Sequence, residues 1–263
     1  MPQNQIAHAK SRTADSHRPM YGVAFLGYMF GNLVLGLFHL SAGRYHYLFV
    51  HSIRQIYFTA FQAFKLVFFI GVALGILVVL PFVSLGFTDI DMLSSLMEKV
   101  LFHQLVPFIA AIVAIGRSGT AITSEIASMQ NQQVMEMLLL EGIDPHHLLV
   151  QPRVIGMTIS MLLLTVWMFA GAILGSSTIV LFVDDVGWLQ VIRASSAMLT
   201  LFELGISALM MVWFGIAIGT IHCYYGLLST DTVLAARNLP KAFVRSFVSC
   251  LVVITLFSLV RYG

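Results

Sequence analysis

Long apolar runs alternate with short polar stretches along most of this chain. Three windows, 66–83, 154–183 and 204–230, contain no Asp, Glu, Lys or Arg. Runs of about 18 or more apolar residues can cross the hydrocarbon core of a membrane as helices. The whole pattern predicts helices over the apolar segments 20–41, 56–83, 96–116, 153–182, 201–227 and 243–261. We therefore expect an all-α integral membrane protein with an N-terminal interfacial helix at 20–41 and five transmembrane helices.

Composition supports this class and excludes several others. Hydrophobic residues make up 59% of the 263 residues and charged residues 10%, whereas soluble domains carry about 25% charged residues. The net charge of +2 is too small to indicate a nucleic-acid partner. The chain has no Gly-x-x-x-x-Gly-Lys-Ser/Thr motif for nucleotide phosphates and no Cys/His cluster with metal spacing. We expect this chain itself to bind no cofactor and no metal.

The distribution of Lys and Arg predicts the orientation, because these residues favour cytoplasmic loops. With a cytoplasmic N-terminus and five spans, most fall on the cytoplasmic side: Lys10, Arg12, Arg18, Arg44, Arg54, Arg117, Arg153, Arg237, Lys241 and Arg245. The far side receives Lys99, Arg193 and Arg261. If 20–41 crossed the membrane as a sixth helix, this asymmetry would weaken. We favour five spans with a C-terminus on the far side of the membrane, and the spanning alternative for 20–41 stays open.

This pattern divides the chain into three parts. Residues 1–19 are predicted to form a disordered cytoplasmic tail, 20–55 an interfacial or elbow-helix region, and 56–263 the five-helix domain. The run 154–183 would make a helix of about 45 Å, which exceeds the hydrocarbon core of roughly 30 Å. That helix must tilt, break near Gly171 or Gly175, or project from the bilayer.

A polar interruption at about 117–150 separates the second and third predicted spans. It is longer than a connection between spans requires, and it is amphipathic. It carries an arginine, four carboxylates and a glutamine cluster: Arg117, Glu125, Glu136, Glu141, Asp144, Gln130, Gln132 and Gln133. On the cytoplasmic side, such a segment indicates a docking surface for another protein.

The start of this segment also admits an enzymatic interpretation. Gly116-Arg117-Ser118-Gly119 fits the Gly-x-Ser-Gly pattern of rhomboid-type intramembrane serine proteases, with His222 as the candidate base. The match is short, and the serine stands at the end of a predicted span. These small residues equally permit close approach of helices. A third interpretation is that the chain is a membrane scaffold that binds lipid without transporting it.

Polar and small residues inside the spans favour a cavity or close packing. Gln104 is followed by Pro107, which removes a backbone donor and can kink its helix. A polar side chain at membrane depth usually faces a partner or a cavity. Gly71-x-x-x-Gly75 can support close helix packing, although glycine is common in membrane helices. Glu203 lies near the membrane surface, so contact with water explains its charge there as well as a partner or a cavity does.

Several short motifs follow one another in a defined order. They are His103-Gln104-Leu105-Val106-Pro107, Gly116-Arg117-x-Gly119-x-Ala121, Glu125-Ile126, Met129, Gly142-Ile143-Asp144-Pro145, Pro152-Arg153 and Ile221-x-Cys223-Tyr224-x-Gly226. Their order and spacing resemble the MlaE/YrbE family, the permease subunits of ABC transporters that work with MCE proteins. The resemblance covers roughly residues 50–260.

Three departures from the family pattern mark a divergent member. The family usually has Arg-Glu-Leu-Gly-Pro where this chain has His103-Gln104-Leu105-Val106-Pro107, so the charged pair is lost. The family's Thr-Glu-Gln is replaced by Gln132-Gln133-Val134. The aspartate often found in the last helix is replaced by an apolar residue around Ile254.

The resemblance implies a function and a set of partners. The chain would be the homodimeric permease subunit, itself not an enzyme, of an ATP-driven phospholipid transporter in a bacterial inner membrane. ATP and magnesium would bind to separate cytoplasmic ABC ATPase subunits. A periplasmic MCE-domain protein would exchange lipid with the dimer, and a small STAS-type subunit is a further partner of such systems.

The resemblance also implies two groups of site residues. The polar segment would act as the coupling helix, and its contact with the ATPase would involve Arg117, Glu125, Gln133, Glu136, Glu141 and Asp144. The lipid cavity would be lined by Leu77, Val78, Leu80, Phe82, Gln104 and Pro107.

Overall fold

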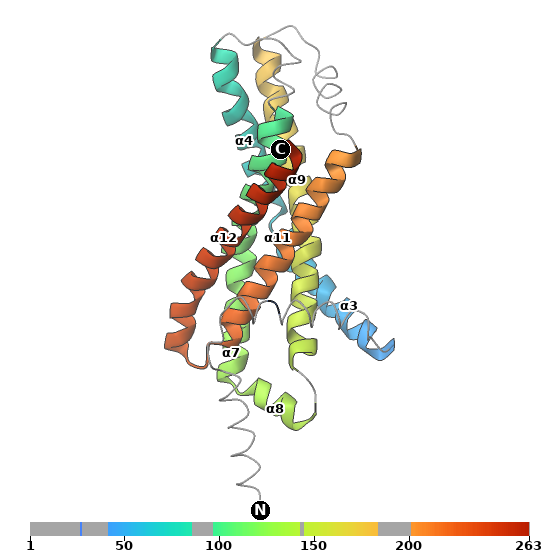
Figure 1. Ribbon diagram of the computed structural model, residues 1–263, viewed down its shortest axis with the longest axis vertical. Helices are drawn as coiled ribbons and strands as arrows, with labels where there is room; N and C mark the ends of the chain where they lie inside the picture. Colours follow the sequence, from blue (N-terminus) through green and yellow to red (C-terminus); the bar gives the residue numbers. More distant parts are fainter. Residues whose placement is uncertain (1–26, 28–41, 86–96, 143–144, 184–200, 263) are drawn as a thin grey trace, which may run out of the picture.

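The computed structural model describes residue 27 and residues 42–85, 97–142, 145–183 and 201–262. Within these ranges the chain is helical and has no β-strand (Figure 1). Five helices in the described residues are long and apolar enough to cross a membrane: Phe64–Ser84, Lys99–Asn131, Leu148–Ile179, Phe202–Leu227 and Thr232–Arg261. The predicted all-α membrane fold with five spans is therefore confirmed. The predicted helix at 20–41 lies outside the described residues, apart from Gly27.

The five spans are built from α-helices and short π-helical turns. The elements are α3 (Ala42–Ile56), η1 (Tyr57–Phe61), α4 (Phe64–Ser84), η2 (Met97–Leu105), α6 (Val106–Ala114), η3 (Ile115–Gly119), α7 (Thr120–Asn131), α8 (Val134–Leu140), η4 (His146–Val150), α9 (Gln151–Val183), α11 (Leu201–Leu227) and α12 (Thr232–Tyr262). η2, α6, η3 and α7 follow one another without a break and make one long second span.

The second and last spans differ in length from the sequence prediction. The second was expected to end at 116, but its helix continues to Asn131. The last was expected to begin at 243, but α12 begins at Thr232 and contains Pro240. Both extensions carry polar residues on surfaces that pack against the bundle; for example, Asn238 is buried and donates a hydrogen bond to Ser229 Oγ (3.1 Å). Hydropathy alone therefore ends the second span too early and begins the last span too late.

Helices α4 and α9 pack with their backbones in contact through glycines on both sides. A Cβ at Gly71 or Gly75 would collide with backbone atoms of α9, and one at Gly171 or Gly175 would collide with backbone atoms of α4. The expected role of Gly71-x-x-x-Gly75 in close packing is confirmed. Gly171 and Gly175 do not break α9, which is one uninterrupted helix.

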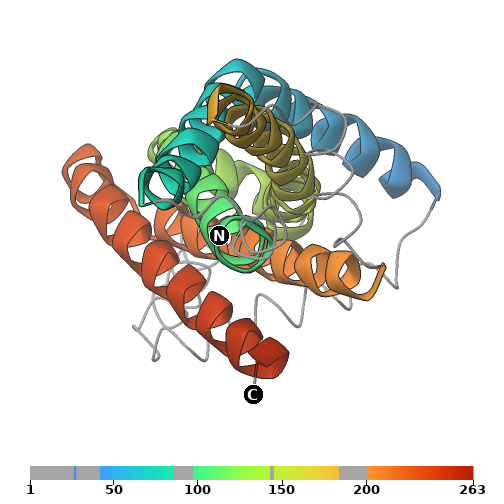
Figure 2. The same cartoon turned by 90° about the horizontal axis from the view of Figure 1, so that it is seen from above.

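The core of the bundle is formed around α9. One stripe of α9 is buried at helical spacing: Met157, Met161, Leu164, Met168 and Ala172. Helix α11 packs against α9 with buried Phe214 and Ile218. Viewed from above, α12 runs along the outside of the bundle, where it contacts α11 and α7 (Figure 2). Its outward face exposes Val244, Val248, Val252 and Leu256, as expected of a surface that meets lipid or a second subunit.

Candidate functional site

The long second span ends in a sharp turn that sets off α8 as a separate short helix. Gln133 has φ 59° and ψ 20°, the left-handed conformation, which is uncommon for a residue other than glycine. Its N–H donates to Gln130 O and its carbonyl accepts from Met137 N–H, both at 3.1 Å. Gly142, with φ 76°, follows α8 and donates to Leu139 O at 3.1 Å. These two turns hold α8 below the end of the bundle (Figure 1).

Helix α8 presents large apolar side chains to the outside. Met137, Leu139 and Leu140 are 59%, 51% and 85% exposed, whereas Met135 is buried. The predicted Glu136 and Glu141 are exposed beside them. An exposed apolar patch with charged residues at its edge is typical of a protein interaction site. Sequence reasoning did not identify the apolar residues of this patch. Their signal was the apolar run 134–140, which at seven residues is too short to span a membrane.

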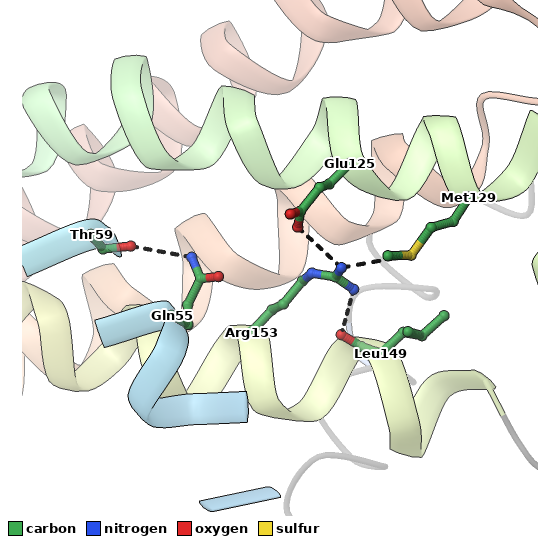
Figure 3. A network of polar contacts seen from close by, with 6 residues as sticks. All are labelled: Gln55, Thr59, Glu125, Met129, Leu149 and Arg153. Carbon is green, nitrogen blue, oxygen red and sulfur yellow. Dashed lines mark hydrogen bonds and ion pairs between the residues drawn. The ribbon is translucent and has the colours of Figure 1, made fainter. Parts of the chain in front are cut away.

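An ion pair joins α7 and α9, the helices before and after α8 in the chain (Figure 3). Arg153 of α9 donates from Nη2 to Glu125 Oε2 of α7 at 3.1 Å. Its Nη1 donates to Leu149 O at 2.9 Å, and Nη2 lies 3.7 Å from Met129 Sδ. The arginine side chain is 11% exposed and the glutamate 61%. The pair links α7 to the start of α9, the helices that precede and follow α8 in the chain.

Arg117 lies elsewhere, on the side of the second span. Its Nη2 donates to Gln62 Oε1 at 3.1 Å, and its guanidinium lies 5.8 Å from the ring centre of Phe58. The six residues expected to act together at the coupling contact are thus distributed over three places. Arg117 and Glu125 lie on the bundle, Gln133 forms the turn, and Glu136 and Glu141 flank the apolar patch; Asp144 lies outside the described residues.

The six expected cavity residues lie toward the opposite end of the bundle and do not converge on a cavity within this chain. Leu77 and Leu80 point outward from α4, 65% and 48% exposed. Val78 and Phe82 are half-buried on the same helix, with Val78 packed against the core. On the second span, Gln104 is half-buried and Pro107 is buried at the start of α6. A cavity lined by this set would need a second surface facing α4.

A largely buried cluster of ionisable side chains lies at this same end. Arg261 of α12 pairs through Nε with Glu203 Oε2 of α11 (2.8 Å) and donates from Nη2 to Glu203 O (3.2 Å) and Ser207 Oγ (3.1 Å). His103 Nε2 of η2 lies 3.4 Å from Glu203 Oε2. The side chains of Arg261 and His103 are only 7% and 4% exposed. Glu203, whose side chain is 23% exposed, thus contacts residues of two other helices in addition to lying near the surface.

Ser118 and His222 do not form a nucleophile and base. His222 is fully buried in α11, and its Nδ1 hydrogen-bonds with Thr123 Oγ1 at 2.7 Å. Among the hydrogen bonds of the described residues, none joins Ser118 to His222. A Cβ at Gly119 would lie 2.5 Å from His222 Nε2, so the histidine ring rests directly on this glycine. The Gly-x-Ser-Gly match is thus explained by packing of the second span against α11.

Comparison with known proteins agrees with this arrangement. Residues 52–260 match the family described as Permease MlaE. The chloroplast protein TRIGALACTOSYLDIACYLGLYCEROL 1 of Arabidopsis thaliana is 26% identical over 162 residues, which cover 62% of this chain and 46% of that protein. A probable ABC transporter permease of Synechocystis is 28% identical over 62% of this chain and 61% of its own length.

A third relative is the MlaE permease protein of an intermembrane phospholipid transport system in Haemophilus influenzae. It is 26% identical over 48% of this chain and 49% of its own length. The chain thus spans about half to three fifths of the length of these three relatives. Because the family match extends over most of the described helices, this chain belongs to the MlaE permease family.

Proposed function

We propose that this chain is the membrane-spanning subunit of an ATP-driven phospholipid transporter in a bacterial inner membrane. The observation that carries the proposal is the family match over residues 52–260, which includes all five spans and α8. In this proposal the protein works as a homodimer. It has a cytoplasmic N-terminus and a periplasmic C-terminus, and exchanges lipid with a periplasmic MCE-domain protein. ATP is hydrolysed by separate ABC subunits, since the chain lacks a phosphate-binding loop.

Helix α8 is the proposed contact with the ATPase. Its apolar residues Met137, Leu139 and Leu140 would enter a groove of the partner, as amphipathic helices do in other complexes. Glu136 and Glu141 would lie at the rim, where charges influence partner choice more than affinity. The left-handed Gln133 and the Arg153–Glu125 pair hold α8 in a fixed relation to the second and third spans. A movement of the ATPase would thereby reach the helices of the bundle.

The proposed lipid path lies at the other end of the bundle, between two subunits. The outward-facing Leu77 and Leu80 would supply an apolar wall for acyl chains, with Gln104 near headgroup depth. Because the family's charged pair is lost, we expect weak electrostatic selection of headgroups. Photo-crosslinkers placed at Val78 and Gln104 should capture phospholipid. Capture elsewhere in the dimer, with none at either position, would place the cavity in a different region.

Copurification tests the proposal most simply. A tagged chain extracted from its own membranes in mild detergent should carry an ABC ATPase and an MCE-domain protein, identified by mass spectrometry. Leu140→Glu should release the ATPase, because loss of a central apolar anchor costs about 2 kcal/mol or more of binding free energy, over tenfold in affinity. Val233→Glu is the matched control, since Val233 is also a large exposed apolar residue (62%) but belongs to the start of α12 and not to α8. Absence of an ATPase from the wild-type preparation, or equal retention in both variants, would contradict the proposal.

A further inference from the structure

A cavity of about 440 Å³ lies between helix α3, the C-terminal half of α7 and the start of α9. From α3 and η1 it is lined by His51, Arg54, Gln55 and Phe58. From α7 come Glu125 and Met129, and from α9 and the turn before it Leu149 and Arg153, among others. Figure 3 shows five of these residues, with the Arg153 guanidinium between the ribbons of α7 and α9 and Gln55 beside it. Of the residues expected at the ATPase contact, Glu125 lines this cavity, and none of the six expected lipid-path residues does.

The cavity walls are held rigidly. Ser52 Oγ donates to Pro152 O at 3.3 Å, and this bond is buried between α3 and α9. A Cβ at Gly156 would lie 2.6 Å from Gln55 Cβ, so α3 rests closely on α9. On the far wall, Arg153 is fixed by Glu125 and Leu149 O. The hollow between these contacts is therefore a preformed feature of the fold.

The charges lining the cavity favour an anion. Two arginines, Arg54 and Arg153, face one carboxylate, Glu125, so the arginine and carboxylate charges alone give 2 − 1 = +1. Glu125 already pairs with Arg153. Arg54 is exposed, and among the described residues it has no ion-pair partner. An arginine guanidinium in this position is suited to bidentate binding of a phosphate.

The surroundings of the cavity are those of a lipid site rather than of a soluble anion. The elements that form its outer wall, α3 and η1, expose Phe49, Ile53 and Phe61, at 66%, 48% and 73%. Phe58, 40% exposed, lines the cavity itself. An amphipathic helix with exposed aromatic residues lies in the membrane interface, at the depth of lipid phosphates. A cationic cavity next to such a surface offers places for both the phosphate and the acyl chains.

We propose that this cavity binds the phosphate of an anionic phospholipid from the cytoplasmic leaflet, with Arg54 as the principal charged contact. The phosphate bonds Arg54 and approaches His51, while the acyl chains lie along Phe58 and the apolar face of α3. The volume is within the range of small-molecule sites, and it accommodates a headgroup and its glycerol. This site is distinct from the transport path, so the inference does not rest on the proposed function beyond the cytoplasmic placement of α3.

Binding to the delipidated, copurified assembly tests this site by native mass spectrometry. The probes are dioleoyl phosphatidylglycerol, dioleoylglycerol without a phosphate, and glycerol 3-phosphate without acyl chains. Arg54→Gln should weaken phosphatidylglycerol binding about fivefold, the usual effect of one interfacial cation on an anionic lipid. Glu125→Gln should strengthen it, because one negative charge is removed from the cavity wall. Arg237→Gln, an exposed arginine of α12 outside the cavity, should leave it unchanged.

Three results would overturn the proposal. One is equal phosphatidylglycerol binding by the wild type and Arg54→Gln. Another is binding of glycerol 3-phosphate as tight as that of phosphatidylglycerol, which would assign the cavity to a soluble anion. The third comes from a photoactivatable phosphatidylglycerol, whose adducts should map to peptides containing 51–58 or 148–153; adducts confined to other helices would place the lipid elsewhere. Because these experiments measure lipid binding without ATP, their outcome does not depend on whether the complex transports lipid.

Discussion

The contact between α4 and α9 allows a sharp prediction about Gly75. A Cβ added at Gly75 would lie 2.7 Å from Ser176 N and 3.0 Å from Ala172 C, and still closer to Ala172 O. Ordinary contacts of a Cβ begin at about 3.4 Å, and all three of these neighbours are backbone atoms that cannot rotate away. Gly75→Ala therefore forces the two helices apart.

The magnitude follows from two opposing terms. Overpacking of a closely packed contact costs about 1–3 kcal/mol. Replacing glycine by alanine in a helix returns up to about 1 kcal/mol of intrinsic propensity. We expect a net loss of about 1–2 kcal/mol, because separation also weakens the contacts of Gly71, Gly171 and Gly175. Adding Gly175→Ala to the Gly75→Ala variant should cost less stability than Gly175→Ala costs in the wild type, because the first substitution has already separated the helices.

Gly205 supplies the matched control. It lies in α11, and a Cβ there would meet nothing within 4 Å. Gly205→Ala should therefore leave the protein as stable as the wild type or slightly more stable. The assay is thermal unfolding of the detergent-solubilised protein, followed by fluorescence-detected size exclusion. A melting temperature for Gly75→Ala equal to or above that of Gly205→Ala would refute the packing described for α4 and α9.

Four further predictions concern single positions. Gln133→Gly should be neutral or stabilise by up to about 1 kcal/mol, because glycine adopts a left-handed conformation without strain; a loss of thermal stability would show that the Gln133 side chain contributes more than its backbone does. Arg261→Ala should lower the free energy of unfolding by about 1–3 kcal/mol, since it leaves partly buried Glu203 without its arginine; an unchanged melting temperature would argue against the cluster. Ser118→Ala should leave assembly and lipid transfer nearly unchanged and Ser118→Leu should disrupt packing, whereas complete loss of activity in a well-assembled Ser118→Ala complex would restore the nucleophile. Double charge reversal at Glu136 and Glu141 should reduce ATPase retention modestly, as exposed pairs contribute about 0–1 kcal/mol each; retention and lipid-stimulated ATP hydrolysis equal to those of the wild type would remove these carboxylates from the interface.

Hydrophobic runs predicted the number and placement of the spans, because a membrane imposes length and apolarity on each helix by itself. They did not predict where α7 and the start of α12 lie. Residues 117–131 are polar along one side and so fall below any hydropathy threshold, yet Ile122 and Ile126 are fully buried against neighbouring helices. Helix ends set by packing between segments distant in sequence cannot be obtained from a local pattern.

The same limit applies to the functional residues. Glu136 and Glu141 could be assigned to an exposed segment because carboxylates between two spans have few other places to lie. The cluster of His103, Glu203 and Arg261 could not be predicted in this way, because its members come from three different spans. A weak signal was present, since each is an ionisable residue near the same predicted end of its helix. Pairing them required knowing which helices are neighbours.

The central claim is that α8 couples ATP hydrolysis on another subunit to phospholipid movement through this chain. The most direct measurement is transfer of fluorescent phospholipid from proteoliposomes that contain the copurified complex to acceptor vesicles, with and without ATP. We predict ATP-dependent transfer by the wild type and by Val233→Glu, and loss of that dependence in Leu140→Glu when the complex is reassembled with equal amounts of each subunit. Transfer that does not depend on ATP in the wild type, or that stays ATP-dependent and undiminished in Leu140→Glu, would contradict the account.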